Sequence, residues 1–326
     1  MPYNLKEIMA TRPSRFTEGH RMCAGCGAPP VIRMILRAIK PEDHAVISNA
    51  TGCLEVSSFI YPYTSWTDSY IHTAFENAAA TCSGVEAAYN ALKRKGKLIE
   101  EENEHTKFIT FGGDGGTYDI GIQALSGAME RGHDMTYVCY DNGAYMNTGI
   151  QRSSATPHFA DTTTSPAGEV IPGKMQIRKD LTLIMASHHL PYVAQTIATG
   201  NFSDLFTKAE KAIYTKGPTF LNVLAPCNRG WGYKPEDLME INKLAVETTY
   251  WPLYEVIDGV FHVTKIPNRK PIEEFLRPQA RFKHLFKPGN EWMIEEFQKE
   301  VDKRYQELLD LEQITNKEIN SKEGGN

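Results

Sequence analysis

Short apolar runs alternate with longer amphipathic stretches along most of this chain, and that order predicts an α/β fold. Strands are expected at residues 45–48, 108–111, 135–140, 192–198 and 219–224, with a hairpin at 254–264. Helices are expected at residues 31–39, 74–95, 181–188, 202–215, 235–248, 272–285 and 291–312. The pattern favours a mostly parallel sheet with helices on both faces, followed by a C-terminal helical extension.

Three segments lack such a pattern. Residues 54–72 are rich in aromatic side chains and predict a loop, either packed at the surface or forming a wall over a bound cofactor. Residues 150–177 are too long for an ordinary connection, so we expect an active-site or interface loop. We divide the chain into an irregular N-terminal arm (1–22), a main domain (23–250), and a hairpin and helical extension for subunit contacts (251–326).

Residues 107–149 combine two predicted strands with polar residues that suit a cofactor. Gly113-Asp114-Gly115-Gly116 follows the first strand, a helical stretch comes next, and Asn142 follows the second strand. Strands joined by a crossover helix are parallel and end at the same edge of a sheet, so Asp114 and Asn142 should be neighbours. Oxygen ligands beside bare glycine amides suit a pyrophosphate with its Mg²⁺.

The spacing within this stretch is more specific than the glycine turn alone. A lone Gly-Asp-Gly also suits a tight connection between a strand and a helix. Here the motif is followed by residues 116–141, which is 141 − 115 = 26 residues, and then by Asn142. That spacing resembles the motif of enzymes that bind thiamine pyrophosphate (TPP).

Composition limits the remaining function classes. The chain has 41% hydrophobic and 23% charged residues and a net charge of −5, so nothing suggests nucleic acid or an anionic membrane as partner. No apolar run approaches the roughly 20 residues of a membrane helix, and the N-terminus lacks the apolar core of a signal peptide. We therefore expect a cytoplasmic protein whose cysteines are ligands or buried thiols more than disulfides.

Four of the six cysteines stand at predicted turns. Cys23 and Cys26 form a Cys-x-x-Cys pair, whereas Cys53 and Cys227 each follow a predicted strand. One pair with two distant cysteines suits a [4Fe–4S] cluster, which takes four thiolates. A zinc site, which would more often show a second pair, and a redox dithiol remain open. The other two lie inside predicted elements and are expected to be buried structural thiols: Cys82 and Cys139.

The chain resembles the β subunits of pyruvate:ferredoxin oxidoreductases (pyruvate synthases), within the 2-oxoacid:ferredoxin oxidoreductase family. The resemblance covers residues 18–285. It rests on CAGCGAP from position 23, ATGCLE from 50, FENAAA from 75, GDGGTYDIGIQALSGAMERGHD from 113, CYDNGAYMNTGIQRSSATP from 139 and APCNRGW from 225. This set of motifs is specific for the family and less specific for pyruvate over other 2-oxoacids.

The resemblance implies a TPP-binding fold and assigns roles to matching positions. A [4Fe–4S] cluster would be held by Cys23, Cys26, Cys53 and Cys227. Mg²⁺ would be held by Asp114, the Asn142 side chain and the Ala144 carbonyl, and Asn147 would reach the substrate or the thiazolium. The cofactor contacts would be Gly52, Gly113, Asp114, Gly115, Gly116, Asn142, Ala144, Asn147 and Thr148. After Cys227 the chain has Asn228-Arg229 where a proline-containing stretch is expected.

The implied reaction is the reversible oxidative decarboxylation of pyruvate to acetyl-CoA and CO₂, with electrons passed to ferredoxin. The implied partners are an α subunit, γ and δ subunits or their fused equivalents, ferredoxin, pyruvate and coenzyme A. Three alternatives remain: the same chemistry on oxalate, 2-oxoisovalerate or 2-oxoglutarate; a non-redox TPP decarboxylase or carboligase subunit; and an electron-transfer subunit with a cluster but no TPP.

One catalytic group is not evident in the sequence. TPP enzymes activate the aminopyrimidine with a glutamate, which in this family's heteromeric members lies on a partner subunit. Glu55 and Glu76 are local candidates, but we favour the partner as its source. We therefore predict that the isolated chain does not turn over pyruvate with a viologen dye. Turnover by the purified single subunit would contradict this prediction.

Overall fold

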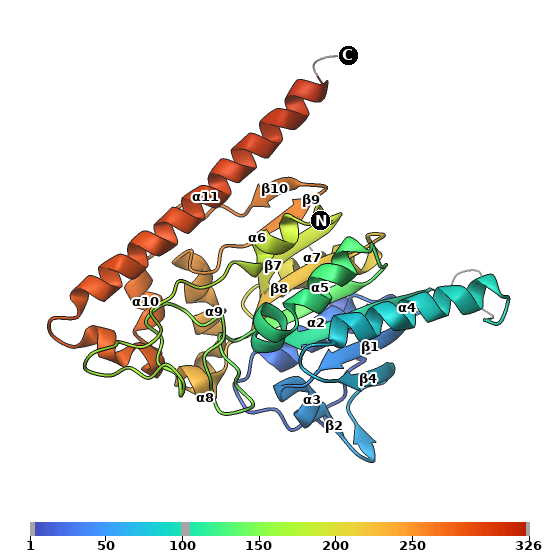
Figure 1. The fold of residues 1–326 in the computed structure, drawn as a ribbon, viewed down its shortest axis with the longest axis horizontal. Coiled ribbons are helices and arrows are strands. Elements are labelled where there is room, and N and C mark those ends of the chain that lie inside the picture. The colour runs from blue at the N-terminus through green and yellow to red at the C-terminus, as the bar shows by residue number, and fades with distance from the viewer. Residues whose placement is uncertain (1–3, 99–104, 324–326) are drawn as a thin grey trace.

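The computed structural model describes residues 4–98 and 105–323 and confirms the mostly parallel sheet. Within these ranges, eight strands pair in the order β10-β9-β7-β8-β6-β5-β1-β4 (Figure 1). The strands are β1 (His44–Ala50), β4 (Ser69–Thr73), β5 (Thr106–Gly113), β6 (Thr136–Asp141), β7 (Tyr192–Ile197), β8 (Thr219–Leu224), β9 (Tyr254–Ile257) and β10 (Val260–Val263). The six strands from β7 to β4 run parallel, and the predicted hairpin β9–β10 adds an antiparallel edge.

Helices cover both faces of the sheet, as the pattern predicts. On one face, α2 (Ala28–Arg37) and α7 (Phe202–Tyr214) pack on the sheet in one apolar cluster. On the other face, a second cluster contains residues of α4 (Ala78–Arg94), α5 (Ile122–Glu130) and α6 (Leu181–Ala186). Every residue of β6, β7 and β8 is buried, which explains why these strands appear as continuous apolar runs without alternation.

The two ends of the parallel sheet differ in topology. From β1 the chain passes outward to β4, whereas from β5, on the other side of β1, it crosses to β6. The strand order therefore reverses between β1 and β5. In open α/β sheets a crevice for ligands lies at such a point, outside the carboxyl ends of the strands.

A third apolar cluster joins the C-terminal elements to this framework. It contains residues of α9 (Leu238–Glu247), which follows the short 3₁₀-helix η2 (Pro235–Asp237), and of α10 (Ile272–Leu276). The single helix predicted at 272–285 is wrong, because α10 ends before Pro278 and a 3₁₀-helix, η3 (Ala280–Phe286), follows.

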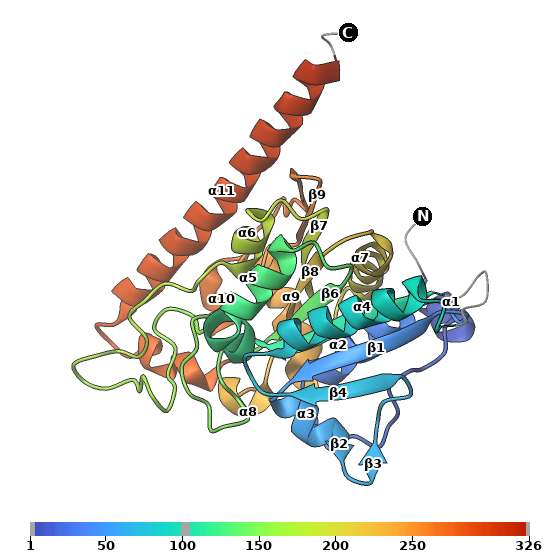
Figure 2. The ribbon, with the colours of Figure 1, turned by 45° about the vertical axis from the view of Figure 1, so that its right-hand side comes forward.

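The predicted loop at 54–72 is also wrong. The chain forms α3 (Cys53–Ser58), a two-stranded hairpin of β2 (Phe59–Ile60) and β3 (Tyr63–Thr64), and then β4 at the sheet edge (Figure 2). β4 pairs with β1 in parallel, with Tyr70 opposite Ile47. Its five residues carry little local signal, and the pairing with β1 decides their conformation.

The N-terminal segment is not irregular throughout. Residues 1–3 lie outside the described ranges, but α1 (Leu5–Thr11) is a helix capped by the Asn4 side chain. Ile8 is buried, and Phe16 packs edge-on against Trp66 at 4.9 Å between ring centroids. The segment therefore packs on its own chain, and its contact with another subunit stays a prediction.

The long irregular segment is confirmed, because residues 150–177 contain no helix or strand. It is nonetheless packed, since Ser153, Thr156 and Phe159 are fully buried. Its β-type hydrogen bonding is limited to isolated bridges such as Thr162–Ser165. The segment is therefore a well-packed loop beside the carboxyl edge of the sheet.

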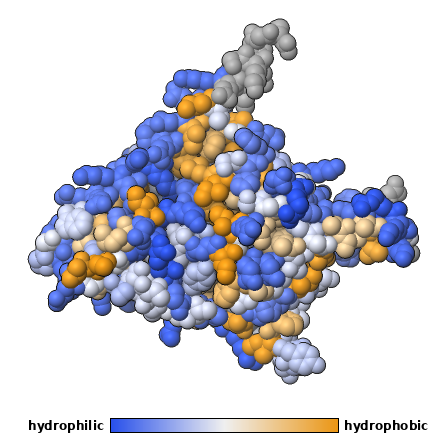
Figure 3. Space-filling view, in the orientation of Figure 1, coloured by the Kyte–Doolittle hydropathy of each residue, from blue (hydrophilic) through white to orange (hydrophobic). Residues whose placement is uncertain are grey.

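The C-terminal helix α11 (Glu291–Glu323) is longer than predicted and leaves the body of the molecule (Figure 1). Its first half packs on the chain itself through Phe297, Val301, Tyr305 and Leu308. In Figure 3 a strip of hydrophobic residues runs from α11 down the middle of the visible face. No helix in the described ranges is long and apolar enough to span a membrane. A role of α11 in subunit contacts stays a prediction.

The packing of α11 on the sheet generates a test of stability. Leu308 is fully buried, and Leu308→Ala should lower the free energy of unfolding by about 2–5 kcal/mol because it leaves a cavity. The neighbouring Glu307→Ala is the matched control and should change it by no more than about 0.5 kcal/mol, since Glu307 is exposed. Urea denaturation measures both, and equal effects would contradict this packing.

Candidate functional site

A pocket lies at the carboxyl ends of β1, β5 and β6, where the strand order reverses. It is lined by Thr51, Gly52, Cys53, Phe75, Gly113, Asp114, Gly115, Gly116, Tyr140, Asn142, Ala144, Tyr145, Met146, Asn147 and Thr148. All nine residues expected to contact the cofactor are in this set. The aromatic side chains of the lining were not expected there, although the family motifs contain Tyr140 and Tyr145.

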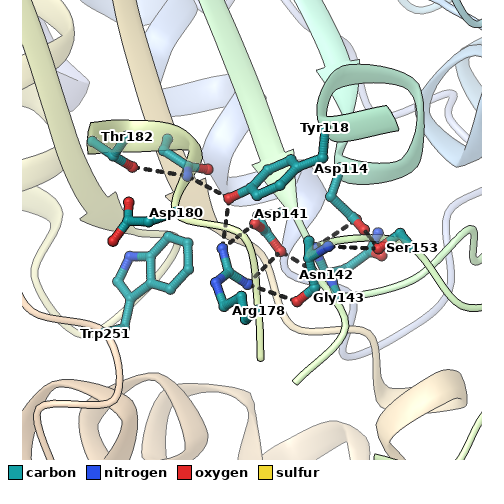
Figure 4. A network of polar contacts seen from close by, with 12 residues as sticks. Asp114, Tyr118, Asp141, Asn142, Gly143, Ser153, Arg178, Asp180, Thr182 and Trp251 are labelled. Carbon is teal, nitrogen blue, oxygen red and sulfur yellow. Dashed lines mark hydrogen bonds and ion pairs between the residues drawn. The ribbon is translucent and has the colours of Figure 1, made fainter. Parts of the chain in front are cut away.

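Asp114 and Asn142 are neighbours, as the parallel strands require. The Asn142 backbone amide donates to Oδ1 of Asp114 at 3.1 Å, and the Ser153 hydroxyl donates to Oδ2 at 2.6 Å (Figure 4). Ser153 comes from the irregular segment 150–177, thirty-nine positions from Asp114 in the chain. No local pattern could have identified it, because only the fold of that segment brings it to the carboxylate.

The Asn142 side-chain amide lies between this carboxylate and the Ala144 carbonyl. The oxygen of the Asn142 side-chain amide faces two acceptors, Oδ1 of Asp114 and the Ala144 carbonyl. A turned amide would donate to both of them at 2.9 Å. That orientation satisfies both acceptors without an ion, whereas the opposite orientation presents three oxygens to a cation. Carboxylate, amide and carbonyl oxygens are the hard ligands that Mg²⁺ prefers, so these residues fit that ion.

The electrostatics of Asp114 favour the same conclusion. Asp114 has no exposed surface. Burial, and secondly the Asp141 carboxylate, raise the pKa of Asp114 well above its usual range, although the bonds from Ser153 and Asn142 oppose them. A cation at the three oxygens would lower that pKa again, because an adjacent positive charge stabilises the carboxylate.

The glycine turn opens into a helix with an unusual first stretch. Residues Gly115–Ile120 form a π-helical turn, η1, which runs directly into α5. A side chain at Gly115 would meet the ring of Tyr145 at 2.4 Å, so the close approach of these backbones requires glycine. π-turns are frequent at functional sites, and the first amides of such a helix favour phosphate oxygens. The turn therefore suits the pyrophosphate.

Gly52 is required for a different reason. A β-carbon at Gly52 would lie 2.8 Å from the hydroxyl of Tyr140, which is buried on β6. The pocket floor between β1 and β6 thus leaves no room for a side chain. Asn147 and Thr148 lie at the exposed rim of the pocket, and the Thr148 hydroxyl donates to the Gln151 side chain at 2.5 Å. Asn147 is therefore the freer of the two to meet a ligand.

A buried ion pair supports the turn after β6. Arg178 donates to Asp141 at 2.6 Å, and both side chains are almost or fully inaccessible (Figure 4). The same guanidinium donates to the Tyr118 hydroxyl at 2.6 Å and lies 4.6 Å from the Trp251 ring centroid. Asp141 also accepts from the Gly143 amide at 3.1 Å. The network orients the backbone between Asn142 and Ala144, and no pattern in the sequence predicts it.

The four turn cysteines surround the adjoining corner of the same edge. Cys23 and Cys26 precede α2, and the Cys26 amide donates to the Cys23 carbonyl at 3.2 Å. Cys53 begins α3. Cys227 caps α8 (Asn228–Trp231), which replaces the proline-containing stretch expected there. The Gly27 amide donates to the Pro226 carbonyl at 2.9 Å and ties two of these turns together.

The four thiols lie close enough for their charges to influence one another's pKa. Burial raises the pKa of Cys26 to about 12, and the charges of the other three cysteines add to it. Burial likewise raises the pKa of Cys53 to about 12, with contributions from Cys227, Cys23 and Asp114. Backbone amides nevertheless reach two of the sulfurs, from Ala28 to Cys26 at 3.5 Å and from Gly230 to Cys227 at 3.4 Å. Such bonds favour thiolates that ligate a metal.

The thiols do not converge on a single point. Among the described residues, no three His, Cys, Asp or Glu side chains are placed to hold one metal ion. All six cysteines are free, and Cys82 and Cys139 are buried in α4 and β6, as expected. The site formed by Cys23, Cys26, Cys53 and Cys227 is called the four-cysteine corner below.

The corner and the pocket are physically continuous. Cys53 belongs to both, since it also lines the pocket. The indole N–H of Trp231, at the end of α8, donates to the Asn142 carbonyl at 2.6 Å. The two candidate glutamates lie outside the pocket lining: Glu55 faces His72 at 3.5 Å, and Glu76 is exposed.

The chain is similar to known proteins over nearly its whole length. Residues 50–223 match the family described as thiamine pyrophosphate enzyme, C-terminal TPP binding domain. The chain is 50% identical to pyruvate synthase subunit PorB of Thermotoga maritima over 97% of this chain and 98% of that protein. It is 54% identical to pyruvate synthase subunit PorB of Methanocaldococcus jannaschii over 90% of this chain and 96% of that protein.

A solved structure shows a similar fold. It is described as 2-oxoglutarate:ferredoxin oxidoreductase from Magnetococcus marinus with 2-oxoglutarate, coenzyme A and succinyl-CoA bound. The similarity has a TM-score of 0.53 and 25% sequence identity, and it covers 65% of this chain and 66% of that chain. The sheet, the pocket and these matches define a protein of the thiamine pyrophosphate enzyme class. Within that class, the chain belongs to the family of pyruvate synthase PorB subunits.

The ion pair beneath the pocket generates a second test of stability. Arg178→Met leaves the buried Asp141 without its counter-charge, which should cost about 3–5 kcal/mol of unfolding free energy. Arg269→Met is the control, because Arg269 pairs with Asp302 at 2.6 Å on the surface and should cost less than about 1 kcal/mol. Denaturant titration of both variants checks this, and equal losses would contradict it.

Proposed function

We propose that this chain is the TPP- and [4Fe–4S]-binding subunit of a 2-oxoacid:ferredoxin oxidoreductase that acts on pyruvate. One observation carries the proposal: the pocket that fits a magnesium pyrophosphate and the four-cysteine corner share Cys53. A non-redox TPP enzyme has no use for an electron acceptor there. An electron-transfer subunit without TPP has no use for the oxygens at Asp114.

In the proposed site, the three converging oxygens hold Mg²⁺ and the glycine turn binds the pyrophosphate. When bound, TPP supplies a carbanion that attacks the keto carbon of a 2-oxoacid and takes up the electrons released with CO₂. Asn147 stands at the rim, where its exposed amide can meet the substrate or the thiazolium. Ser153 and the Arg178 network keep the carboxylate and the adjacent backbone in place without touching the substrate.

The four-cysteine corner is proposed to hold the electron acceptor. A zinc ion would draw four sulfurs to about 2.3 Å from one centre. One Cys-x-x-Cys pair with two distant cysteines, whose charges all help to raise the pKa of Cys26, favours a [4Fe–4S] cluster over zinc. Because Cys53 also lines the pocket, a cluster held there would lie beside the cofactor, where electrons leave the substrate.

Pyruvate is favoured as the substrate by the relatives at 50% and 54% identity, which are named pyruvate synthase subunits. Oxalate, 2-oxoisovalerate and 2-oxoglutarate are the alternatives, and a panel of 2-oxoacids on the assembled complex discriminates among them. The proposed partners are the other subunits of the enzyme, with coenzyme A and ferredoxin as reactants. A cytoplasmic location is part of the proposal.

The two halves of the site can be removed independently. In the assembled complex, purified anaerobically, Asp114→Ala should abolish TPP binding and activity but leave iron and sulfide unchanged. Cys23→Ala should lower the iron and sulfide content and abolish activity but leave TPP binding unchanged, because Cys23 is exposed at the corner and lies outside the pocket lining. Titration calorimetry with TPP and Mg²⁺, together with iron and sulfide analysis, checks both.

A control and a contradicting result accompany this test. Cys82→Ala removes a buried thiol of α4 and should retain the full iron content. Absence of iron from the wild-type complex would favour the non-redox enzyme. Activity that survives Asp114→Ala would favour the electron-transfer subunit.

A further inference from the structure

Lys174 is a buried lysine that none of the proposed chemistry uses. Its side chain is 1% exposed and lies inside the irregular segment 150–177. The ammonium group donates to the carbonyls of Ser154 at 3.2 Å and Thr156 at 2.5 Å. Within the described ranges it forms no ion pair with a carboxylate. Burying an ammonium group without a counter-ion costs free energy, so a buried lysine at this position needs a structural explanation.

The backbone around Lys174 is also fixed. Its carbonyl accepts from the Phe159 amide at 2.7 Å, and its amide donates to the Ala160 carbonyl at 3.2 Å. The chain around Lys174 therefore lies against the earlier part of the same segment, at Phe159 and Ala160. The aliphatic part of the side chain spans from this contact to residues 153–156, which are called the 153–156 turn below.

The 153–156 turn is attached to both strands that build the oxygen site. Ser153 donates to Asp114, which follows β5, at 2.6 Å. Thr156 donates to the carbonyl of Gly143, between Asn142 and Ala144 after β6, at 2.7 Å. Within the turn, the Ser153 amide donates to the Thr156 hydroxyl at 2.9 Å. A displacement of the turn would therefore move two sides of the oxygen site together.

We propose that Lys174 is a positioning residue, which clamps the 153–156 turn and thereby holds the magnesium-binding oxygens beside Asp114 in a ready arrangement. This inference rests on the proposed function, because it assigns Lys174 to that cofactor site. Lys174 touches neither cofactor nor substrate. It acts through Ser153 and Thr156, as outer partners of metal ligands do in other sites.

The charge of the clamp should make the site sensitive to pH. Burial lowers the pKa of Lys174 to about 7, with Arg152 and Arg178 adding to the effect and Asp119 and Glu300 opposing it. Below that pH the ammonium makes charge-assisted bonds to the two carbonyls. Above it these become the weaker bonds of a neutral amine, so the affinity for Mg²⁺ with TPP should fall as the pH rises through about 7.

The test uses the assembled complex stripped of Mg²⁺ and TPP. Lys174→Met keeps the length of the side chain but removes its donors, and should raise the dissociation constant of Mg²⁺ with TPP by about 10- to 100-fold. Thermal stability without cofactor should change little, since the loss of two bonds is offset by the loss of a buried charge. Lys174→Arg keeps charge and donors and should restore most of the affinity.

Lys208→Met is the matched control. Lys208 is also buried and donates to a carbonyl, that of Gln195 at 3.0 Å, but it pairs with Asp204 away from the pocket lining. This variant should lose thermal stability and keep its affinity for Mg²⁺ with TPP. If Lys174→Met instead loses stability and affinity together, or loses neither, the positioning role is wrong.

The pH profile supplies a readout that general destabilisation would not alter. The fall in affinity near pH 7 should disappear in Lys174→Arg, because arginine does not titrate in this range. Its persistence in that folded variant would overturn the proposal even if Lys174→Met failed to fold. Failure of the wild-type complex to bind Mg²⁺ with TPP at any pH would instead overturn the proposed function itself.

Discussion

The arrangement of the pocket depends on the buried carboxylate of Asp114, which has no exposed surface. Asp114 sits at the end of β5 with its charge uncompensated by any direct cation among the described residues, and the Asp141 carboxylate lies near it. The protein supplies what neutral groups can, namely the Ser153 hydroxyl and the Asn142 amide. The remaining cost is large unless a cation binds, because a buried ion needs a partner. The Asn142 side-chain amide and the Ala144 carbonyl lie beside it and could supply oxygens to such a cation.

Parallel pairing of β1, β5 and β6 makes this arrangement possible. Each strand delivers a turn to the same edge: Gly52-Cys53 from β1, the glycine turn from β5 and Asn142 from β6. β8 adds Cys227 beside them. The proposed pyrophosphate site and the four turn cysteines therefore lie at one reversal of strand order. Trp231 links them directly, since it follows Cys227 on α8 and donates to the Asn142 carbonyl.

The irregular segment 150–177 has a structural purpose at this edge. It carries Ser153 to Asp114, Arg178 follows directly after it to reach Asp141, and Lys174 closes it upon itself. The segment is irregular because its backbone groups bond to the site and to one another. The rim beside Asn147 stays open, which agrees with a site that a partner completes.

The sequence by itself determined every strand of the large sheet except β4, most of the helices and the nine residues expected at the cofactor. The buried parallel strands appear as apolar runs, and the turns that carry Cys53, the glycines at 113–116 and Cys227 each follow one of them in the chain, so local pattern and topology suffice there. Only the tertiary structure decided what Ser153, Lys174 and Arg178 do, because their partners lie 39, 18 and 37 positions away. It also decided β4 and the break between α10 and η3, where pairing with β1 and a proline outweigh weak local signals.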